Sequence, residues 1–367
     1  MIELVGEGGY EAVALRRLTE LAGVSTRTFY EHFEGKEECF LRTYELVVQR
    51  IGARVASAQV GESDRSRRLE LALQAFAAEL GNKPRAARLA LLEIFGAGPA
   101  AQEAMTRAEA HVEEILQEEL RSPDQVEVSP LLAKAVLNGV AFVARRRMIG
   151  ADSTQGVATA AELSRWALSL RDMPASKALP LSTPTHESRS MSRAEPGERE
   201  ILLAATAKLA ATKGYWQLTV PQILAGAGLR KKSFTSNFAG VEDCFLAVIE
   251  QRTAGLIGRA MAGLSDEMPW ASRVHFFIAN LGTAIASDPV TAKLVFVEAR
   301  SAGRAAVSLQ DELLAGLAND FLCDAPKHHD QPASPIYAEA SLAAIWGIAR
   351  TYVGTGRRGQ LPKLVRV

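Results

Sequence analysis

The stretch VSTRTFYEHFEGKEECFL, residues 24–41, passes from polar to aromatic to charged to apolar character. A related stretch, LRKKSFTSNFAGVEDCFL, occupies residues 229–246. Both place two phenylalanines four residues apart, then a glycine two residues later, then a final Cys-Phe-Leu. The second copy differs where the first carries most of its polar side chains. The two stretches therefore share apolar anchor positions and differ in the surface they offer.

The repeat extends along most of the chain at a constant offset of 205 positions. Between residues 9 and 41, 11 of 33 positions are identical to their partners, whereas average composition gives about two or three. Two further blocks of identities begin at residues 84 and 129, and they include Pro84/Pro289, Glu93/Glu298, Ser129/Ser334 and Arg145/Arg350. One offset across three blocks predicts duplication of a whole unit.

The composition favours packed helices. The chain has 367 residues, 48% of them hydrophobic but only 6% aromatic, and Ala and Leu dominate the apolar set, which suits helix packing in two or more domains. Formal net charge is zero, with 42 basic and 42 acidic residues, so nucleic-acid binding must depend on local charge placement. The absence of an 18-residue apolar run and of a secretory signal predicts a cytoplasmic protein with no membrane span.

No motif in the sequence indicates an enzyme or a metal site. We find no GxSxG, P-loop, HExxH or strand-linked GxGxxG, so we expect no catalytic residues and no cofactor. The three cysteines lack zinc spacing, and no metal ligand set is expected. Cys39 and Cys244 occupy matching apolar positions, which favours small core residues over redox sensors. His328-His329 lies near prolines and is expected in a loop rather than at a metal.

Apolar residues recur at helical spacing over residues 66–80, 86–95, 101–120, 131–148 and 157–170. Their partners in the second half are expected to begin near Arg273, Pro289, Ala305 and Ile336, and no alternating pattern predicts a strand. Between the halves, residues 171–198 hold four prolines and five serines, which predicts an irregular linker. Arg145-Arg146-Arg147 is interpreted as a solvated helix end or an intramolecular ion-pair site.

Residues 14–33 have the pattern of two helices joined by a tight turn. Gly23 can take the left-handed conformation that ends the first helix. Ser25 can cap the second helix by accepting a hydrogen bond from its first turn. Phe29 and Phe33, four residues apart, would face inward, and the outward face keeps Thr26, Arg27, Thr28, Tyr30, Glu31 and His32. Such a helix suits a recognition helix that reads the major groove of double-stranded DNA.

The segment GGYEAVALRRLTELAGVSTRTFYEHFEGKEECFL resembles the tetracycline-repressor (TetR) family of bacterial transcription regulators. The resemblance lies in the Gly-Tyr, the Ala-Gly-Val turn, the Phe-Tyr-x-His-Phe and the Gly-Lys-Glu-Glu. It implies a three-helix DNA-binding head on a larger helical body that holds a small hydrophobic effector and a dimerising four-helix bundle. By position, it implies the DNA contacts Arg16, Ser25, Thr26, Arg27, Thr28, Tyr30, His32 and Lys36.

The second head departs from the family pattern. Tyr30, His32 and Lys36 are replaced by threonine, asparagine and valine, whereas the predicted contacts Arg230, Lys231, Lys232 and Ser233 bring positive charge. Residues 1–50 hold six basic and nine acidic residues, a net charge of −3, and residues 198–252 hold seven and five, a net charge of +2. The three basic residues Arg230, Lys231 and Lys232 therefore form either a second DNA contact surface or a solvated basic turn. Thr219 is expected to cap its helix better than its partner Ala14.

The fold class predicted is all-α, with two TetR-like units paired inside one chain as a pseudo-dimer. The predicted domains are head 1 (1–48, with a first helix shorter than that of the second copy), body 1 (49–171), a linker (172–197), head 2 (198–253) and body 2 (254–367). The predicted function is that of a repressor that binds two non-identical operator half-sites and is released by an effector. The alternative is a helical interaction or effector-binding module that has lost DNA binding in one or both heads.

Overall fold

The computed structural model describes residues 1–121, 129–172, 197–265, 267–322 and 334–364. Every regular element in these ranges is helical and none is a strand, which confirms the predicted helical fold class. Most of the predicted linker and the His328-His329 pair lie outside the described residues. None of the described helices has the length and apolar character needed to cross a membrane.

The chain divides into two compact units. Among the described residues, the first unit contains 1–172, 314–322 and 334–348, and the second contains 197–313 and 349–364. The predicted limits between heads and bodies, at residues 48 and 253, fall inside the continuous helices α4 (Lys36–Ala58) and α13 (Val241–Met261). Each head is therefore joined to its body by an unbroken helix.

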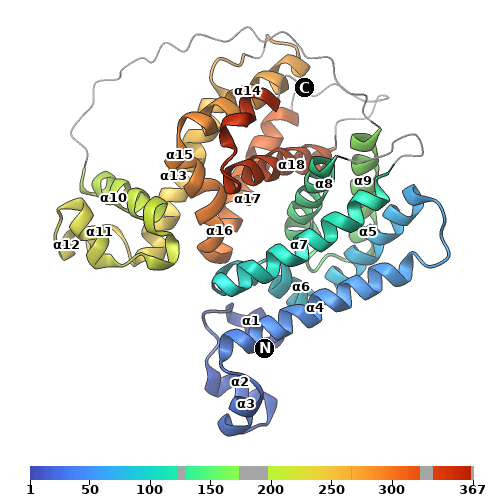
Figure 1. Ribbon diagram of the computed structural model, residues 1–367, viewed down its shortest axis with the longest axis horizontal. Helices are drawn as coiled ribbons and strands as arrows, with labels where there is room; N and C mark the ends of the chain where they lie inside the picture. Colours follow the sequence, from blue (N-terminus) through green and yellow to red (C-terminus); the bar gives the residue numbers. More distant parts are fainter. Residues whose placement is uncertain (122–128, 173–196, 266, 323–333, 365–367) are drawn as a thin grey trace. The chain divides into compact units, whose positions relative to one another are not determined.

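The first unit begins with a small helical head (Figure 1). The head consists of α1 (Ile2–Gly8), α2 (Leu15–Ala22), α3 (Thr26–His32) and the start of α4. The body continues with α5 (Arg65–Asn82), α6 (Pro84–Leu91), η1 (Glu93–Gly96), α7 (Pro99–Glu119), α8 (Pro130–Val143), η2 (Ala144–Met148) and α9 (Ser153–Arg171). In the body, α5 packs on α4 and α9, α7 packs on α8, and α6 contacts α1 of the head.

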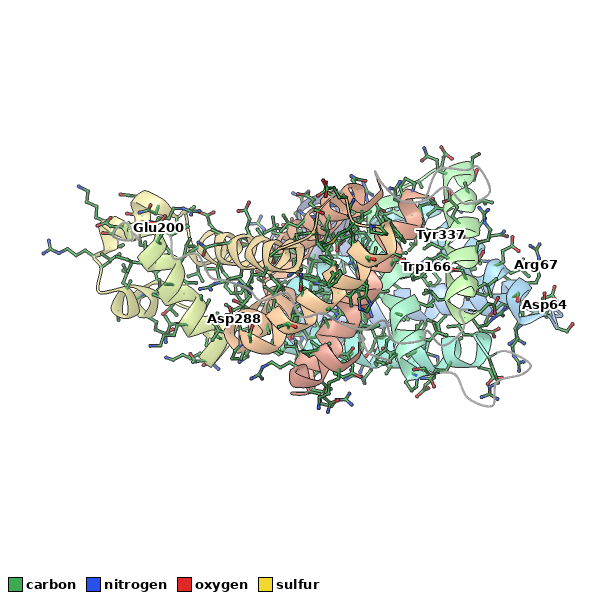
Figure 2. The ribbon with its side chains drawn as sticks, turned by 90° about the horizontal axis from the view of Figure 1, so that it is seen from above. Asp64, Arg67, Trp166, Glu200, Asp288 and Tyr337 are labelled. Carbon is green, nitrogen blue, oxygen red and sulfur yellow. The ribbon has the colours of Figure 1, made fainter. Side chains whose placement is uncertain are left out.

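Local sequence signals account for the helix starts in this unit. Asp64 and Asp152 cap α5 and α9 through their carboxylates, which accept hydrogen bonds from backbone N–H groups at 3.1 and 2.9 Å. Proline is the first residue of α6, α7 and α8, where its missing N–H costs no helical hydrogen bond. The five helical stretches predicted from apolar periodicity all fall within or across these elements. Figure 2 labels the cap Asp64.

The second half of the chain has a similar order of elements, with the additional short segments η3, α16 and η5. Its head contains α10 (Glu198–Lys213), η3 (Tyr215–Gln217), α11 (Val220–Ala227), α12 (Lys231–Asn237) and the start of α13. There follow α14 (Trp270–Ser287), α15 (Pro289–Lys293), η4 (Leu294–Glu298), α16 (Ala299–Ser301), α17 (Gly303–Leu322), α18 (Pro335–Gly354), η5 (Arg358–Gln360) and α19 (Leu361–Leu364). By the division above, residues 314–322 of α17 and 335–348 of α18 belong to the first unit.

Six helices of the second half begin 205 residues after their counterparts. These are α11, α12, α13, α14, α15 and α18, which correspond to α2, α3, α4, α5, α6 and α8. The left-handed glycines match as well: Gly23 and Gly228, each following the first helix of the turn, have φ of 67° and 66°. The first helices of the heads differ, since α1 has 7 residues and α10 has 16. Because these helix starts agree, the 205-residue offset that relates the two halves in sequence also relates the positions of their helices.

In the first unit, α8 and α9 pack against residues 335–348 of α18. The Trp166 indole N–H donates to Ser341 Oγ at 3.0 Å. Arg147 forms two hydrogen bonds of 2.8 Å with the carboxylate of Glu339, which is only 3% exposed. A Cβ at Gly139 would lie 2.3 Å from the Trp166 ring and 2.9 Å from the Ala340 carbonyl oxygen. We call α8, α9 and residues 335–348 the three-helix bundle; Figure 2 labels Trp166 and Tyr337 within it.

Candidate nucleic-acid interface

The predicted recognition helix α3 is held by its apolar face. Phe29 is buried, its ring lies 5.3 Å from that of the half-buried Phe33, and Tyr30 on the outer side is exposed. Ser25 accepts a hydrogen bond from the Thr28 N–H at 3.0 Å, which confirms the predicted cap. Gly23, in the left-handed conformation, ends α2. The sequence therefore fixes both the turn and the side of α3 that faces solvent.

The outer face of α3 carries most of the predicted base contacts. Thr26 and Arg27 are exposed at its first turn, Thr28 is half-buried, and His32 is exposed at its end. Thr28 is also engaged with the cap, because its Oγ1 lies 2.9 Å from Ser25 Oγ. This arrangement offers hydroxyl and guanidinium groups at the helix N-terminus, the part of a recognition helix that reaches base edges.

Two arginines of head 1 are paired with glutamates on their own helices. Arg16 Nε contacts Glu20 Oε1 at 2.8 Å on α2, and Arg27 Nε contacts Glu31 Oε1 at 3.2 Å on α3. Both arginine side chains are 90% exposed, so these are weak surface pairs. A phosphate or a guanine can replace the glutamate, but the glutamates keep the local charge of the head low.

Lys36, predicted as a phosphate contact, folds back toward the turn that precedes α2. Its Nζ donates to the Tyr10 carbonyl oxygen at 3.3 Å and lies 4.3 Å from the centre of the Tyr10 ring. Burial, followed by the nearby Glu37 and Glu11, raises the pKa of Tyr10 to about 12. An ammonium group has three donors, so one hydrogen bond to Tyr10 leaves others for a phosphate.

In head 2, α12 is anchored in the same way. Phe234 and Phe238 are buried in a core with Leu203, Ile223 and Phe245. Arg230 occupies the position before the helix but makes no side-chain cap hydrogen bond. The prediction that Thr219 caps its helix is wrong, because its side chain accepts no hydrogen bond. Pro221, at the position of Arg16, instead fits the first turn of α11.

The basic triad of head 2, Arg230, Lys231 and Lys232, is exposed at the start of α12. In the described parts of the chain, none of its three cations forms an ion pair. By contrast, Ser233 donates to Glu198 Oε1 of α10 at 3.0 Å, and Asn237 donates to the Ser233 carbonyl oxygen at 2.8 Å. The head with the weaker sequence motif therefore has the freer positive charge, and Ser233 is less available than its neighbours.

A buried carboxylate joins each head to its body. Glu93 of η1 accepts a hydrogen bond from the Tyr10 N–H at 3.2 Å, and Glu298 of η4 accepts one from the Tyr215 N–H at 2.9 Å. Both carboxylates belong to buried residues. Tyr10 and Tyr215, like Glu93 and Glu298, are partners at the 205-residue offset. We call these contacts the first and second carboxylate clasps. Sequence reasoning did not assign them a role, although Glu93/Glu298 is one of the identities of the repeat.

The first unit contains a cavity of about 770 Å³ between α1, α4, α5 and α6. Leu46, Val47 and Ile51 of α4 contribute apolar lining, and Lys83 and Arg50 contribute charge. In the second unit, the corresponding face of α13, around Gln251 and Arg252, lines a smaller pocket of about 300 Å³ together with Glu200 and Ala204 of α10. Figure 2 labels Glu200.

Other residues singled out in the sequence serve packing. None of the following body aromatics lines the cavity described above, and all but the half-buried Phe276 are buried: Phe95, Phe142, Phe276, Phe277, Phe296 and Trp346. Burial raises the pKa of both the Cys39 and the Cys244 thiol, which agrees with core positions. Of the arginine run, Arg147 forms an ion pair with the buried Glu339, which confirms the ion-pair interpretation.

Residues 2–43 match the family described as bacterial regulatory proteins, tetR family. The match covers α1, α2, α3 and the start of α4, so head 1 is similar to the helix-turn-helix domain of that family. It supports a DNA-binding transcription regulator rather than an enzyme, as the sequence predicted.

Among solved structures, the chain is similar to the fatty acid degradation regulator FadR from Bacillus halodurans. The identity is 15% and the TM-score is 0.41, over 47% of this chain and 93% of that one. No curated protein matches the sequence.

Proposed function

We propose that this chain is a transcriptional repressor that carries two different helix-turn-helix heads and binds an operator with two non-identical half-sites. The observation that carries the proposal is the outer face of α3. It exposes Thr26, Arg27 and Tyr30 on a helix fixed by the Ser25 cap and the buried Phe29. This face lies within the segment that matches the tetR family.

Duplication of a whole unit forms part of the proposal. Its support is the agreement of six helix starts at the 205-residue offset, together with the two carboxylate clasps at equivalent positions. The pairing of the two copies inside one chain is supported by the three-helix bundle, since α18 is the counterpart of α8. A covalent link between two heads would give the second a high effective concentration at the operator.

Different half-sites follow from the different surfaces of the heads. In head 1, threonine hydroxyls, Arg27 and Tyr30 would contact bases and backbone, and in head 2 the basic triad would supply mainly phosphate contacts. The operator would therefore lack the symmetry that two identical heads require. A cytoplasmic location and double-stranded DNA as partner belong to the same proposal.

The proposal includes a small hydrophobic effector bound at the junction of head 1 and body 1. Its support is the cavity of about 770 Å³, a volume typical of small-molecule sites. The lining includes Ile2 and Glu3 of α1 as well as residues of α4, α5 and α6. An effector there would contact head and body together, so it would change DNA affinity to the extent that it favours one head position over another.

The proposal is tested by measuring DNA binding of two variants. Tyr30→Ala keeps the net charge of the chain, and Lys231→Ala removes one positive charge. Operator duplexes would be selected from a random 40-base-pair pool by the unaltered protein, and affinity would then be measured against salt concentration. Tyr30→Ala should weaken binding, and Lys231→Ala should weaken it and also reduce the salt slope by about one. Arg107→Ala is the matched control, because Arg107 is an exposed cation on α7 of the body.

The alternative, a helical interaction module without DNA binding, is favoured by one observation. Arg16 and Arg27 are both held by glutamates, so head 1 offers little free positive charge. If the unaltered protein selects no duplex from the pool, the repressor proposal fails and this alternative replaces it. If duplexes are selected but Tyr30→Ala and Lys231→Ala bind them with unchanged affinity and salt slope, the two heads are not the DNA contact surfaces and the proposal fails as well.

A further inference from the structure

The carboxylate clasps are the contacts on which a further inference rests. In the first clasp, the Tyr10 N–H donates to Glu93 of the body, and the Tyr10 carbonyl oxygen accepts from Lys36. The N–H and the carbonyl oxygen of Tyr10 are thus held by Glu93 of the body and by the predicted DNA contact Lys36. This continuous chain of contacts runs from η1 through the turn after α1 to the first residue of α4.

The backbone around Tyr10 allows a close approach of the carboxylate. Gly9 has a φ of 79°, and a Cβ at this position would lie 3.0 Å from Glu93 Oε2. Gly214 has a φ of 89°, and its Cβ would lie 3.6 Å from Glu298 Oε2. Only glycine takes such a conformation at little steric cost. Both clasps therefore combine a left-handed glycine, a backbone N–H and a buried carboxylate.

The second clasp is completed differently. Val241 replaces Lys36, so the tyrosine carbonyl has no lysine from α13. Instead, Lys293 of the body donates to the Ala211 carbonyl oxygen at 2.7 Å and lies 3.6 Å from Glu298. The cation of the second clasp thus belongs to the body and not to the predicted DNA surface. The first clasp therefore connects the body to the predicted phosphate contact Lys36. The second clasp connects only the head and the body.

We propose that Glu93 is a positioning residue for DNA binding, which acts through Tyr10 to hold Lys36 in place for a phosphate, and that Glu298 fixes head 2 to its body without such a route. This inference rests on the proposed function for its DNA part. Because Glu93 is the buried hydrogen-bond acceptor for the Tyr10 N–H, removing its carboxylate leaves a buried donor unsatisfied. The head–body part can therefore be tested without DNA.

The first experiment measures hydrogen exchange at the Tyr10 amide. In Glu93→Ala the exchange should be faster than in the unaltered protein by at least tenfold, and in Glu93→Gln it should stay slow, because the amide oxygen can still accept the hydrogen bond. Gly9→Ala is a second variant, expected to speed the exchange with Glu93 intact. Unchanged exchange at Tyr10 in a folded Glu93→Ala protein would overturn the inference, whether or not the chain binds DNA.

The second experiment measures the salt dependence of binding to the selected 40-base-pair duplex. Glu93→Ala should lower the salt slope by about one, as the loss of one phosphate contact requires, and Glu93→Gln should restore it. Glu298→Ala is the matched control and should leave the slope unchanged. A fall in affinity with no change of slope in Glu93→Ala would assign Glu93 a structural role only and contradict positioning. If no duplex is bound by the unaltered protein, the proposed function and the positioning role both fail, while the exchange data still decide the clasp.

Discussion

Ser25 and Arg230 stand at the same position before the two predicted recognition helices. Ser25 accepts a hydrogen bond from the Thr28 N–H, whereas Arg230 makes no side-chain cap. At this position, head 2 therefore lacks the capping hydrogen bond of head 1 and carries a positive charge instead. The two heads begin their recognition helices in the same geometry but with different contributions to stability and to charge.

Removing the cap should destabilise head 1 alone. Ser25→Ala is expected to lower the free energy of unfolding by about 1 kcal/mol, since the loss of a serine cap costs roughly 0.5–2 kcal/mol. Arg230→Ala is the matched control, and it should leave the stability of head 2 within about 0.5 kcal/mol. Urea denaturation followed by hydrogen exchange in α3 and α12 would measure both. Equal losses in the two heads would contradict the assignment of Ser25 as the cap.

At the scale of the element, α3 and α12 differ in how their charges are balanced. On α3, the only cation of the first turn, Arg27, is paired with Glu31 one turn later. On α12, the basic triad has no carboxylate at that spacing, because Thr235 and Ser236 occupy the following turn. The same helix geometry therefore presents a nearly neutral surface in one head and a basic surface in the other.

Removing the carboxylate from α3 should strengthen DNA binding by head 1. Glu31→Gln is expected to raise affinity several-fold at low salt, because it frees Arg27 and removes a negative charge near the phosphates; the gain should shrink as salt rises. Glu45→Gln, on α4 beyond the predicted DNA surface, is the control. Titrations of the selected duplex at two salt concentrations would measure the effect. A gain of equal size in both variants would indicate a general charge effect.

The three-helix bundle also depends on one ion pair. Glu339 is almost fully buried, and Arg147 satisfies both of its oxygens. Arg147→Ala should lower the free energy of unfolding by about 3–5 kcal/mol, because it leaves the buried carboxylate of Glu339 without its two hydrogen bonds. The exposed pair of Arg16 with Glu20 is the control, and Glu20→Ala should change stability little. Thermal unfolding would report both, and similar small shifts would show that the bundle does not depend on this pair.

The sequence predicted the elements better than their contacts. Apolar periodicity, Gly23, Ser25 and the prolines at helix starts are local signals, and each marks a turn or a helix that the structure contains. Phe29 was also placed correctly in the core. The cap expected from Thr219 failed because residue type does not fix the rotamer of a side chain.

The contacts that were missed join distant parts of the chain. Glu93 and Tyr10 are 83 residues apart, so no local pattern could pair them. The available signal was the identity of Glu93 with Glu298 in a largely apolar segment. Lys36 was recognised by its position in a family motif, which did not reveal that it also binds Tyr10. The ion pairs of Arg16 and Arg27 could have been predicted, because both follow the four-residue spacing of helical pairs.

At the scale of the whole molecule, the proposal implies that one chain provides both heads. We expect a single chain to bind the selected operator, with a footprint whose two halves differ in sequence. Light scattering of the free protein and of the complex would measure the number of chains. A complex with two chains on one operator would contradict the self-contained pseudo-dimer, while a symmetric footprint would contradict the non-identical half-sites.

The three-helix bundle has a consequence for synthesis of the chain. Trp166 and Ser341 are 175 residues apart, and Arg147 and Glu339 are 192 residues apart. At about 5–20 residues per second, roughly 9–35 s pass between the emergence of Trp166 from the ribosome and that of Ser341. Throughout that interval, α8 and α9 lack residues 335–348, against which their apolar faces pack in the three-helix bundle. The chain would then be most exposed to chaperones and proteases while its second half is being translated.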